Sequence, residues 1–165
     1  MTYRVCFVCT GNICRSPMAE SVFRARMAEA GLDDRVEADS AGTGGWHEGD
    51  GADPRAVRVL TEHGYDSDHT ARQFQASWFA RLDLVIALDS GHLKALRRLA
   101  PTEEDARKVR LLRSYTRPSP AGDDLDVPDP YYGGLDGFEE CLEMVEAASE
   151  GLLAAVRDEL EGTAA

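Results

Sequence analysis

The stretch that most constrains the fold is VCFVCTGNICRSP at residues 5–17. The apolar run at 5–8 is typical of a buried strand, and Ser16 followed by Pro17 predicts the N-cap and first position of a helix. A strand, a short loop and a helix N-terminus in succession aim backbone N–H groups and the helix dipole at one point. The segment therefore predicts an anion-binding loop between a first strand and a first helix.

Two side chains in this loop predict chemistry. Cys9 lies at its base, where amides, a helix N-terminus and a guanidinium each stabilise a thiolate more than a thiol. We therefore expect Cys9 to lose its proton readily and to act as a nucleophile. Arg15 closes the loop six residues later, and its planar fork can hold two oxygens of a phosphate. The alternative is a buried structural cysteine before an ordinary turn, which would leave Arg15 without an obvious role.

The spacing of the remaining apolar residues predicts an α/β fold in a single domain, residues 1–165. Further strands are expected at 35–41, 82–88 and 108–112, with helices between and after them. This alternation implies a parallel sheet with helices on both faces and active residues at its C-terminal edge. In the predicted helix after the loop, we expect Glu20 to be solvated.

Charge and composition limit the class of partner. The formal net charge is −12, which argues against nucleic acid or an anionic membrane surface, because both require a basic face. No apolar run approaches the roughly 20 residues that span a bilayer. The apolar stretch at the N-terminus is short and contains Arg4, so no signal peptide is expected and the protein is predicted to be cytoplasmic.

The four cysteines are too few and too unevenly placed for a disulfide framework. Cys6 and Cys141 fall on apolar positions and are expected in the core. Cys9 and Cys14 share the loop, and a transient disulfide between them would switch off the nucleophile under oxidation. No second cysteine pair or histidine cluster completes a zinc site, so no metal is expected.

A proline-rich segment at 114–134 is unusually long for a loop and is expected to lie beside the sheet edge. Within it, Asp129 offers a carboxyl group that could protonate a leaving oxygen, and Tyr131 and Tyr132 offer a flat aromatic rim. Three other aspartates compete for the acid role, but their run lacks the following proline and aromatics: Asp123, Asp124 and Asp126. Trp46, on a polar glycine-rich loop, is better placed as a pocket wall than in a core. Its neighbour His47 is expected to be solvated.

The loop VCTGNICRSP at 8–17, together with DPYYG at 129–133, resembles the low-molecular-weight protein tyrosine phosphatases over nearly the whole chain. The resemblance implies the strand order 2-1-3-4 and no cofactor. It assigns catalysis to Cys9, Arg15 and Asp129, and substrate binding to Thr10, Gly11, Asn12, Ile13, Cys14, Ser16, Trp46, Tyr131 and Tyr132. It further implies that Ser40 and His69 support the loop through Asn12. The implied partners are tyrosine-phosphorylated proteins, with phosphate or other oxyanions as inhibitors.

From these residues we predict phosphotyrosine hydrolysis through a phosphocysteine intermediate, with Asp129 as general acid and then base. Three alternatives stay open. A phosphoarginine phosphatase of the same family would carry threonine where this chain has Ile13. An arsenate reductase would need relay cysteines, and none lies between Cys14 and Cys141. A non-catalytic phosphopeptide-binding or thiol-sensing module would keep the loop without turnover. No role is assigned to Asp89 or His92.

Overall fold

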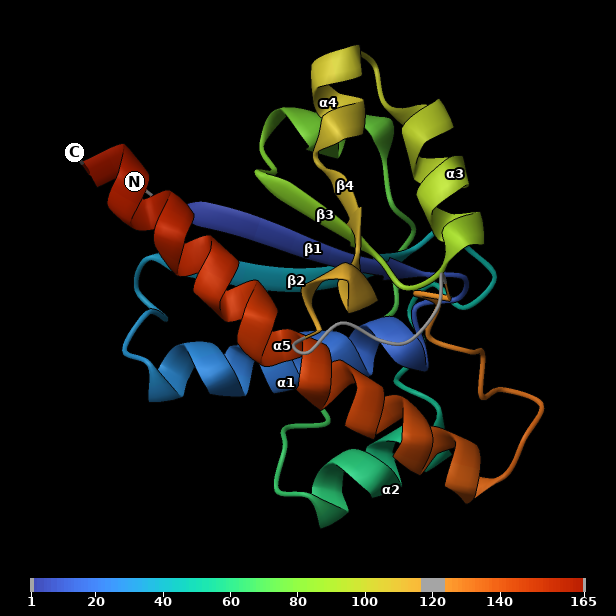
Figure 1. Ribbon diagram of the computed structural model, residues 1–165. Coiled ribbons are helices and arrows are strands. Elements are labelled where there is room, and N and C mark those ends of the chain that lie inside the picture. The colour runs from blue at the N-terminus through green and yellow to red at the C-terminus, as the bar shows by residue number, and fades with distance from the viewer. Residues whose placement is uncertain (1, 117–123, 165) are drawn as a thin grey trace.

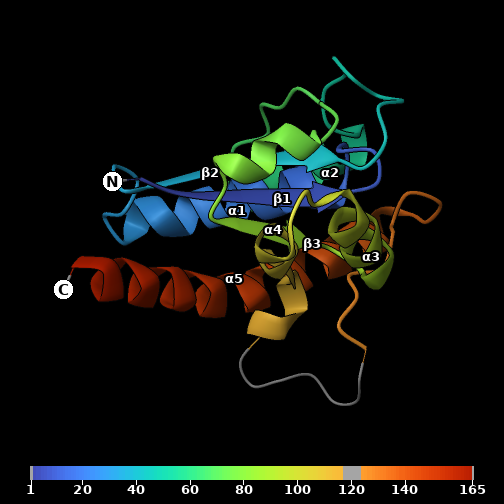
Figure 2. The ribbon, with the colours of Figure 1, turned by 90° about the horizontal axis from the view of Figure 1, so that it is seen from above.

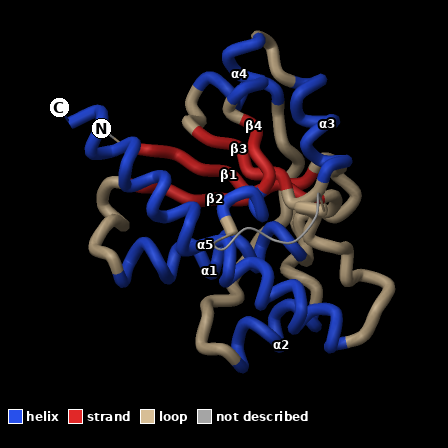
Figure 3. Tube along the Cα trace, in the orientation of Figure 1, coloured by secondary structure: helices blue, strands red, loops and turns tan. Residues whose placement is uncertain are grey.

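A computed structural model describes residues 2–116 and 124–164. At its centre is a four-stranded parallel sheet in the order β2-β1-β3-β4. The strands are β1 (Tyr3–Cys9), β2 (Val36–Gly42), β3 (Leu84–Ala87) and β4 (Val109–Leu111). The predicted fold class and strand order are confirmed, and Figure 3 shows the four strands side by side among the helices.

Helices cover both faces of this sheet, as predicted. In Figure 1, α1 and α2 lie below the strands, α5 runs diagonally from the upper left at its C-terminal end to the lower right, and α3 and α4 lie above the strands; Figure 2 gives the view from above. The helices are α1 (Arg15–Glu29), α2 (Pro54–Glu62), α3 (Ser90–Leu99), α4 (Glu103–Arg107) and α5 (Leu135–Ala164), with 3-10 turns η1 (Ala76–Ala80) and η2 (Leu112–Tyr115). In the described part of the chain, none of the helices has the length and apolar character needed to cross a bilayer.

The sheet has a separate hydrophobic core on each face, and side chains of β1 enter both, because successive side chains of a strand point to opposite faces. Phe7 belongs to the larger core, where it meets Phe23 of α1 edge to face at 5.5 Å and Phe138 of α5 completes the cluster. Val8 belongs to the smaller core, which η1 and α3 cover. Cys9 continues the alternation and therefore faces the α1 side, at the C-terminal end of its strand.

The structure differs from the sequence prediction at several boundaries. Helix α1 begins at Arg15 with Cys14 as N-cap, so the prediction of Ser16 as N-cap is wrong. The Ser16 hydroxyl instead forms tertiary contacts. Strand β3 covers only Leu84–Ala87, the four residues that pair with β1, and β4 pairs with three of them, Val85–Ala87. The short helix α4 was not predicted, since five charged and small residues carry no apolar period.

Close approach at one glycine sets the position of the loop that follows β1. Gly42 ends β2, and a Cβ there would lie 2.7 Å from the carbonyl oxygen of Thr10 and 3.1 Å from the Asn12 nitrogen. Such contacts are shorter than side chains tolerate, so only glycine allows the loop to lie directly against the end of β2.

Candidate active site

The loop between β1 and α1 is organised around Asn12, which is fully buried and has a left-handed φ of 58°. Its side-chain nitrogen donates to Ser16 Oγ at 2.9 Å and to Ser40 Oγ at 3.0 Å. Its side-chain oxygen accepts from the backbone nitrogen of Arg72 at 2.9 Å, and its carbonyl oxygen accepts from His69 Nε2 at 2.5 Å. Four hydrogen bonds, to Ser16 at the start of α1, to Ser40 of β2 and to the 69–72 loop, therefore hold Asn12 in this left-handed conformation.

A second layer of polar contacts supports these partners. Ser40 donates its hydroxyl hydrogen to Glu20 at 2.7 Å, and Glu20 also pairs with Arg24 at 3.0 Å. The side chain of Glu20 is only 13% exposed, so the expectation that it is solvated is wrong. Burial lowers the pKa of His69, which favours a neutral ring that donates from Nε2 to the loop.

The Cys9 sulfur lies 2.9 Å from the hydroxyl of Ser16, and both residues are buried. Because the Ser16 oxygen accepts from Asn12, its own hydrogen is available to the sulfur or to the carbonyl oxygen of Ala41 at 3.3 Å. This arrangement places a hydroxyl donor beside the Cys9 sulfur at the base of the loop.

Arg15 is 2% exposed, and buried acceptors fix its guanidinium. Nη1 donates to Asp89 at 2.8 Å and to the carbonyl oxygen of Val127 at 2.9 Å, while Nη2 lies 3.7 Å from Asp129. Burial alone would lower the pKa of Arg15. The neighbouring Cys9, Asp89 and Asp129 outweigh burial and raise it, so the guanidinium stays charged.

Asp89 and His92, to which the sequence assigned no role, lie directly against this arginine. Asp89 caps α3 by accepting from the backbone nitrogen of His92 at 2.9 Å, and its second oxygen binds Arg15. The His92 ring lies 2.8 Å from Thr10 Oγ1 and 3.5 Å from Arg15 Nη2. Burial, and then the charge of Arg15, lower the pKa of His92 to about 4, so the ring is neutral at neutral pH. The sequence signal that was available is the position of Asp89 directly after a buried strand.

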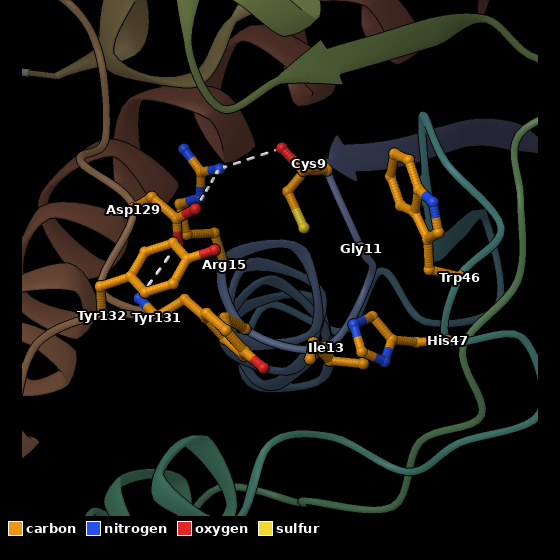
Figure 4. A pocket seen from close by; sticks show the side chains of 11 residues that line it. Cys9, Gly11, Ile13, Arg15, Trp46, His47, Asp129, Tyr131 and Tyr132 are labelled. Atoms are coloured by element: carbon orange, nitrogen blue, oxygen red, sulfur yellow. Dashed lines mark hydrogen bonds and ion pairs between the residues drawn. The ribbon is translucent and has the colours of Figure 1, made fainter.

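These groups open onto a pocket of about 330 Å³, shown in Figure 4. Its lining is Cys9, Thr10, Gly11, Ile13, Cys14, Arg15, Trp46, His47, Asp129, Tyr131 and Tyr132. The structure therefore brings together every predicted catalytic residue and most of the predicted substrate-binding residues. Asn12 and Ser16 are outside the lining and fully buried behind the loop. His47 was expected to be solvated, yet it forms part of the pocket wall and is 35% exposed.

The rim of the pocket is aromatic and open to solvent. Trp46 is 76% exposed and Tyr132 92%, and the rings of Tyr131 and Tyr132 meet edge to face at 5.0 Å. Figure 4 shows Trp46 and the tyrosines on opposite sides of Cys9. Asp129 is 45% exposed, and one of its oxygens accepts from the backbone nitrogen of Tyr131 at 3.0 Å.

The two competing aspartates in the described part of the chain, Asp124 and Asp126, do not line the pocket. Asp126 accepts from the backbone nitrogen of Ser90 at 2.8 Å, and Asp124 accepts from that of Asp126 at 3.0 Å. Asp123 lies outside the described residues.

Cys6, Cys9, Cys14 and Cys141 all fall in the described part of the chain, where each is a buried thiol without a disulfide. Burial raises the pKa of Cys14 and raises that of Cys141 to about 12. The regulatory Cys9–Cys14 disulfide stays a prediction. Across residues 2–116 and 124–164, no group of three or more potential ligand side chains could hold a metal ion.

The sequence of this chain is similar to those of known phosphatases. The family model described as low molecular weight phosphotyrosine protein phosphatase matches residues 4–162. A low molecular weight protein-tyrosine-phosphatase of Streptomyces coelicolor is 79% identical over the full length of both chains. Low molecular weight protein-tyrosine phosphatase A of Mycobacterium tuberculosis is 49% identical over 148 residues, covering 90% of this chain and 88% of its own.

Solved structures with a similar fold belong to phosphatases of the same kind. A protein tyrosine phosphatase from Entamoeba histolytica, crystallised with Hepes in its active site, has a TM-score of 0.89 at 34% identity, covering 96% of this chain and 99% of its own. YfkJ from Bacillus subtilis has a TM-score of 0.87 at 38% identity, covering 96% and 97%. The chain therefore belongs to the low molecular weight phosphotyrosine protein phosphatase family.

Proposed function

We propose that this chain is a protein tyrosine phosphatase that hydrolyses phosphotyrosine through a phosphocysteine intermediate. The observation that carries the proposal is the convergence of Cys9, Arg15 and Asp129 on one pocket. Each supplies what phosphoryl transfer needs, namely a nucleophile, a fixed positive charge and a proton donor.

In the first step, the Cys9 thiolate attacks phosphorus in line with the bond to the phenolic oxygen. Arg15 and the amides of the loop hold the other phosphate oxygens, and the buried contacts of Arg15 to Asp89 and Val127 keep its orientation fixed before substrate arrives. As the P–O bond breaks, Asp129 gives its proton to the departing phenolate, which leaves as tyrosine.

In the second step, water attacks the phosphocysteine and the S–P bond breaks. Asp129, now ionised, accepts a proton from that water, and the sulfur leaves as a thiolate. The Ser16 hydroxyl, 2.9 Å from the sulfur, stabilises the charge that develops there. Phosphate is then released and the loop returns to its starting state.

The shape of the pocket supports an aromatic substrate. Cys9 is 2% exposed at the base, and the rim is formed by exposed aromatic rings. A phenyl ring is long enough to place its phosphate on the sulfur while it contacts Trp46 and Tyr131. Ile13 lines the pocket where the phosphoarginine enzymes have threonine, so we expect faster turnover of phosphotyrosine than of phosphoarginine.

Four buried thiols without a disulfide also support a reducing compartment, so the proposal includes a cytoplasmic location, which cell fractionation would test.

The decisive experiment measures hydrolysis of para-nitrophenyl phosphate without added metal, and then of phosphotyrosine and phosphoarginine peptides. Cys9→Ser should abolish turnover but retain phosphate binding in the loop. Asp129→Asn should slow aryl phosphates with poor leaving groups by about 100-fold or more, because these depend most on the proton. Asp124→Asn, an exposed change in the same segment, is the matched control. Saturable phosphate binding without turnover by the unmodified protein would support the binding module instead.

A further inference from the structure

One cation outside the phosphate loop connects the two parts of the site. Arg55 lies in the first turn of α2, and its Nε and Nη2 donate to the two carboxylate oxygens of Asp53, each at 3.0 Å. The remaining donors turn to the segment after Asp129. Nη1 donates to the carbonyl oxygen of Gly133 at 2.7 Å, and Nη2 donates to that of Tyr131 at 2.9 Å. The planar fork is therefore shared between a carboxylate and two backbone carbonyls.

Aromatic rings fix the same guanidinium from its face. Its central carbon lies 4.6 Å from the ring centre of Phe138 and 5.6 Å from that of Tyr131. Phe138 is fully buried at the start of α5, so one side of the cation rests on the core. The Arg55 side chain is 33% exposed, which leaves its contacts only partly screened by solvent.

The anchor of this arginine also contacts the phosphate loop. Asp53 is 8% exposed and caps α2 by accepting from the Arg55 nitrogen at 2.9 Å. The backbone nitrogen of Asp53 donates to the carbonyl oxygen of Ile13 at 2.8 Å. Hydrogen bonds from Arg55 lower the pKa of Asp53, so both partners are charged at neutral pH. A continuous chain of bonds thus runs from the loop that holds Cys9 to the backbone around Tyr131.

The segment that carries Asp129 is attached on its N-terminal side at Val127, whose nitrogen donates to the carbonyl oxygen of Leu88 at 2.8 Å and whose oxygen accepts from Arg15 at 2.9 Å. It has few attachments on its C-terminal side. Its own bonds, from Tyr131 N to Asp129 and from Gly133 N to the Pro130 oxygen, set the local turn but not its place over the pocket. Asp129 itself contacts the rest of the site at 3.7 Å from Arg15. Among the described residues, the hydrogen bonds that join 129–134 to an element before it in the chain are those of Arg55.

We propose that Arg55, held by Asp53, is a positioning residue that keeps the Asp129 carboxyl group within reach of the leaving oxygen above Cys9. The inference rests on the proposed role of Asp129 as general acid. Lysine cannot replace this arginine, because a single ammonium group cannot bind both carboxylate oxygens and two carbonyls in one plane. Loss of the fork should therefore displace the acid while the nucleophile and Arg15 stay in place.

The test measures kcat/KM of Arg55→Lys on a series of aryl phosphates with increasingly poor leaving groups. We expect a loss of about 10-fold or more on the poorest leaving groups and less than about threefold on the best, because only the former need the proton. Arg58→Lys is the matched control, since Arg58 lies on the same helix and pairs with Glu62 on the surface. The kcat/KM of Arg58→Lys should equal that of the unmodified enzyme on every substrate. An equal loss on all leaving groups would overturn the proposal.

A double variant separates positioning from a general structural effect. If Arg55 acts through Asp129, Arg55→Lys should cause no further loss on poor leaving groups in an Asp129→Asn background. A further loss of similar size there would contradict the inference. Asp53→Asn keeps the helix cap but removes the charge that holds Arg55, so it should reproduce the pattern of Arg55→Lys if that variant fails to fold.

The same series distinguishes the two proposals. If Asp129→Asn shows no preference for good leaving groups, the general acid is wrong and the positioning role is overturned with it. If Asp129→Asn shows that preference and the Arg55 and Asp53 variants do not, the proposed function stands and only the positioning role is refuted.

Discussion

His92 gives a stability prediction whose size follows from its burial. The ring is 5% exposed, and burial together with Arg15 lowers its pKa from 6.5 to about 4. The carboxylates that face it oppose this shift without reversing it: Asp89, Asp129 and Asp126. The folded protein therefore keeps a neutral His92 at pH values where the unfolded chain binds a proton.

The direction of the effect follows from proton linkage. Well above pH 6.5 the ring is neutral in both states, so it contributes no pH dependence there. As the pH falls from 6.5 towards 4, protonation favours the unfolded chain and the free energy of unfolding decreases. At 1.36 kcal/mol per pKa unit, the loss attributable to His92 is about 2 kcal/mol at pH 5 and about 3 kcal/mol below pH 4.

His92→Gln removes this titration and keeps a polar group of similar reach toward Thr10. Urea unfolding of both proteins, followed by tryptophan fluorescence between pH 7.5 and pH 5, gives the difference in their free energies of unfolding at each pH. Loss of packing adds a constant to that difference. On acidification we expect the difference to change by about 2 kcal/mol in favour of the variant. Parallel curves, with a change below about 0.5 kcal/mol, would refute the assignment of a buried neutral histidine.

Two further predictions concern the pocket. Ser16→Ala removes the hydroxyl 2.9 Å from the Cys9 sulfur and should lower kcat by about 10- to 100-fold, because a hydrogen bond to a charged group contributes about 1.5–3 kcal/mol. Rapid-mixing kinetics should then show slower breakdown of the phosphocysteine, and an unchanged second step would contradict this role. Trp46→Ala should raise KM for phosphotyrosine peptides several-fold with little change in kcat, since the ring is 76% exposed at the rim. A comparable fall in kcat would show that the ring acts on the transition state.

The sequence predicted the sheet, and the place of Cys9 and Arg15 in one loop at its edge, because both depend on local patterns. A buried strand followed by a glycine-containing loop and a helix start is readable over thirteen residues, and Cys9 and Arg15 occur within it. Asp129 was identified by its immediate neighbours, Pro130 and the two tyrosines. In each case the relevant chemistry is contained in one short segment.

The contacts that the sequence missed join distant segments. Asp89 meets Arg15 across 74 positions, and His92 meets Thr10 across 82, so no spacing rule relates them. Ser16 was misplaced for a related reason. A serine before proline is a good N-cap, but the hydroxyl of Ser16 bonds to Asn12 and Cys9 in three dimensions, and the helix starts two residues earlier than predicted. Glu20 of α1 was expected in solvent because its partner Ser40 lies 20 positions away on β2.

The attachment of Asn12 has a consequence for redesign of this enzyme. None of the four residues that bond to Asn12 lines the pocket. The aromatic rim, by contrast, projects outward at Trp46 and Tyr132. Substrate selectivity therefore depends on the rim side chains, whereas the shape of the phosphate loop depends on the contacts of Asn12. Exchanging the rim for side chains that suit a different peptide should leave turnover of small aryl phosphates intact, so new substrate preferences are accessible without rebuilding the machinery below.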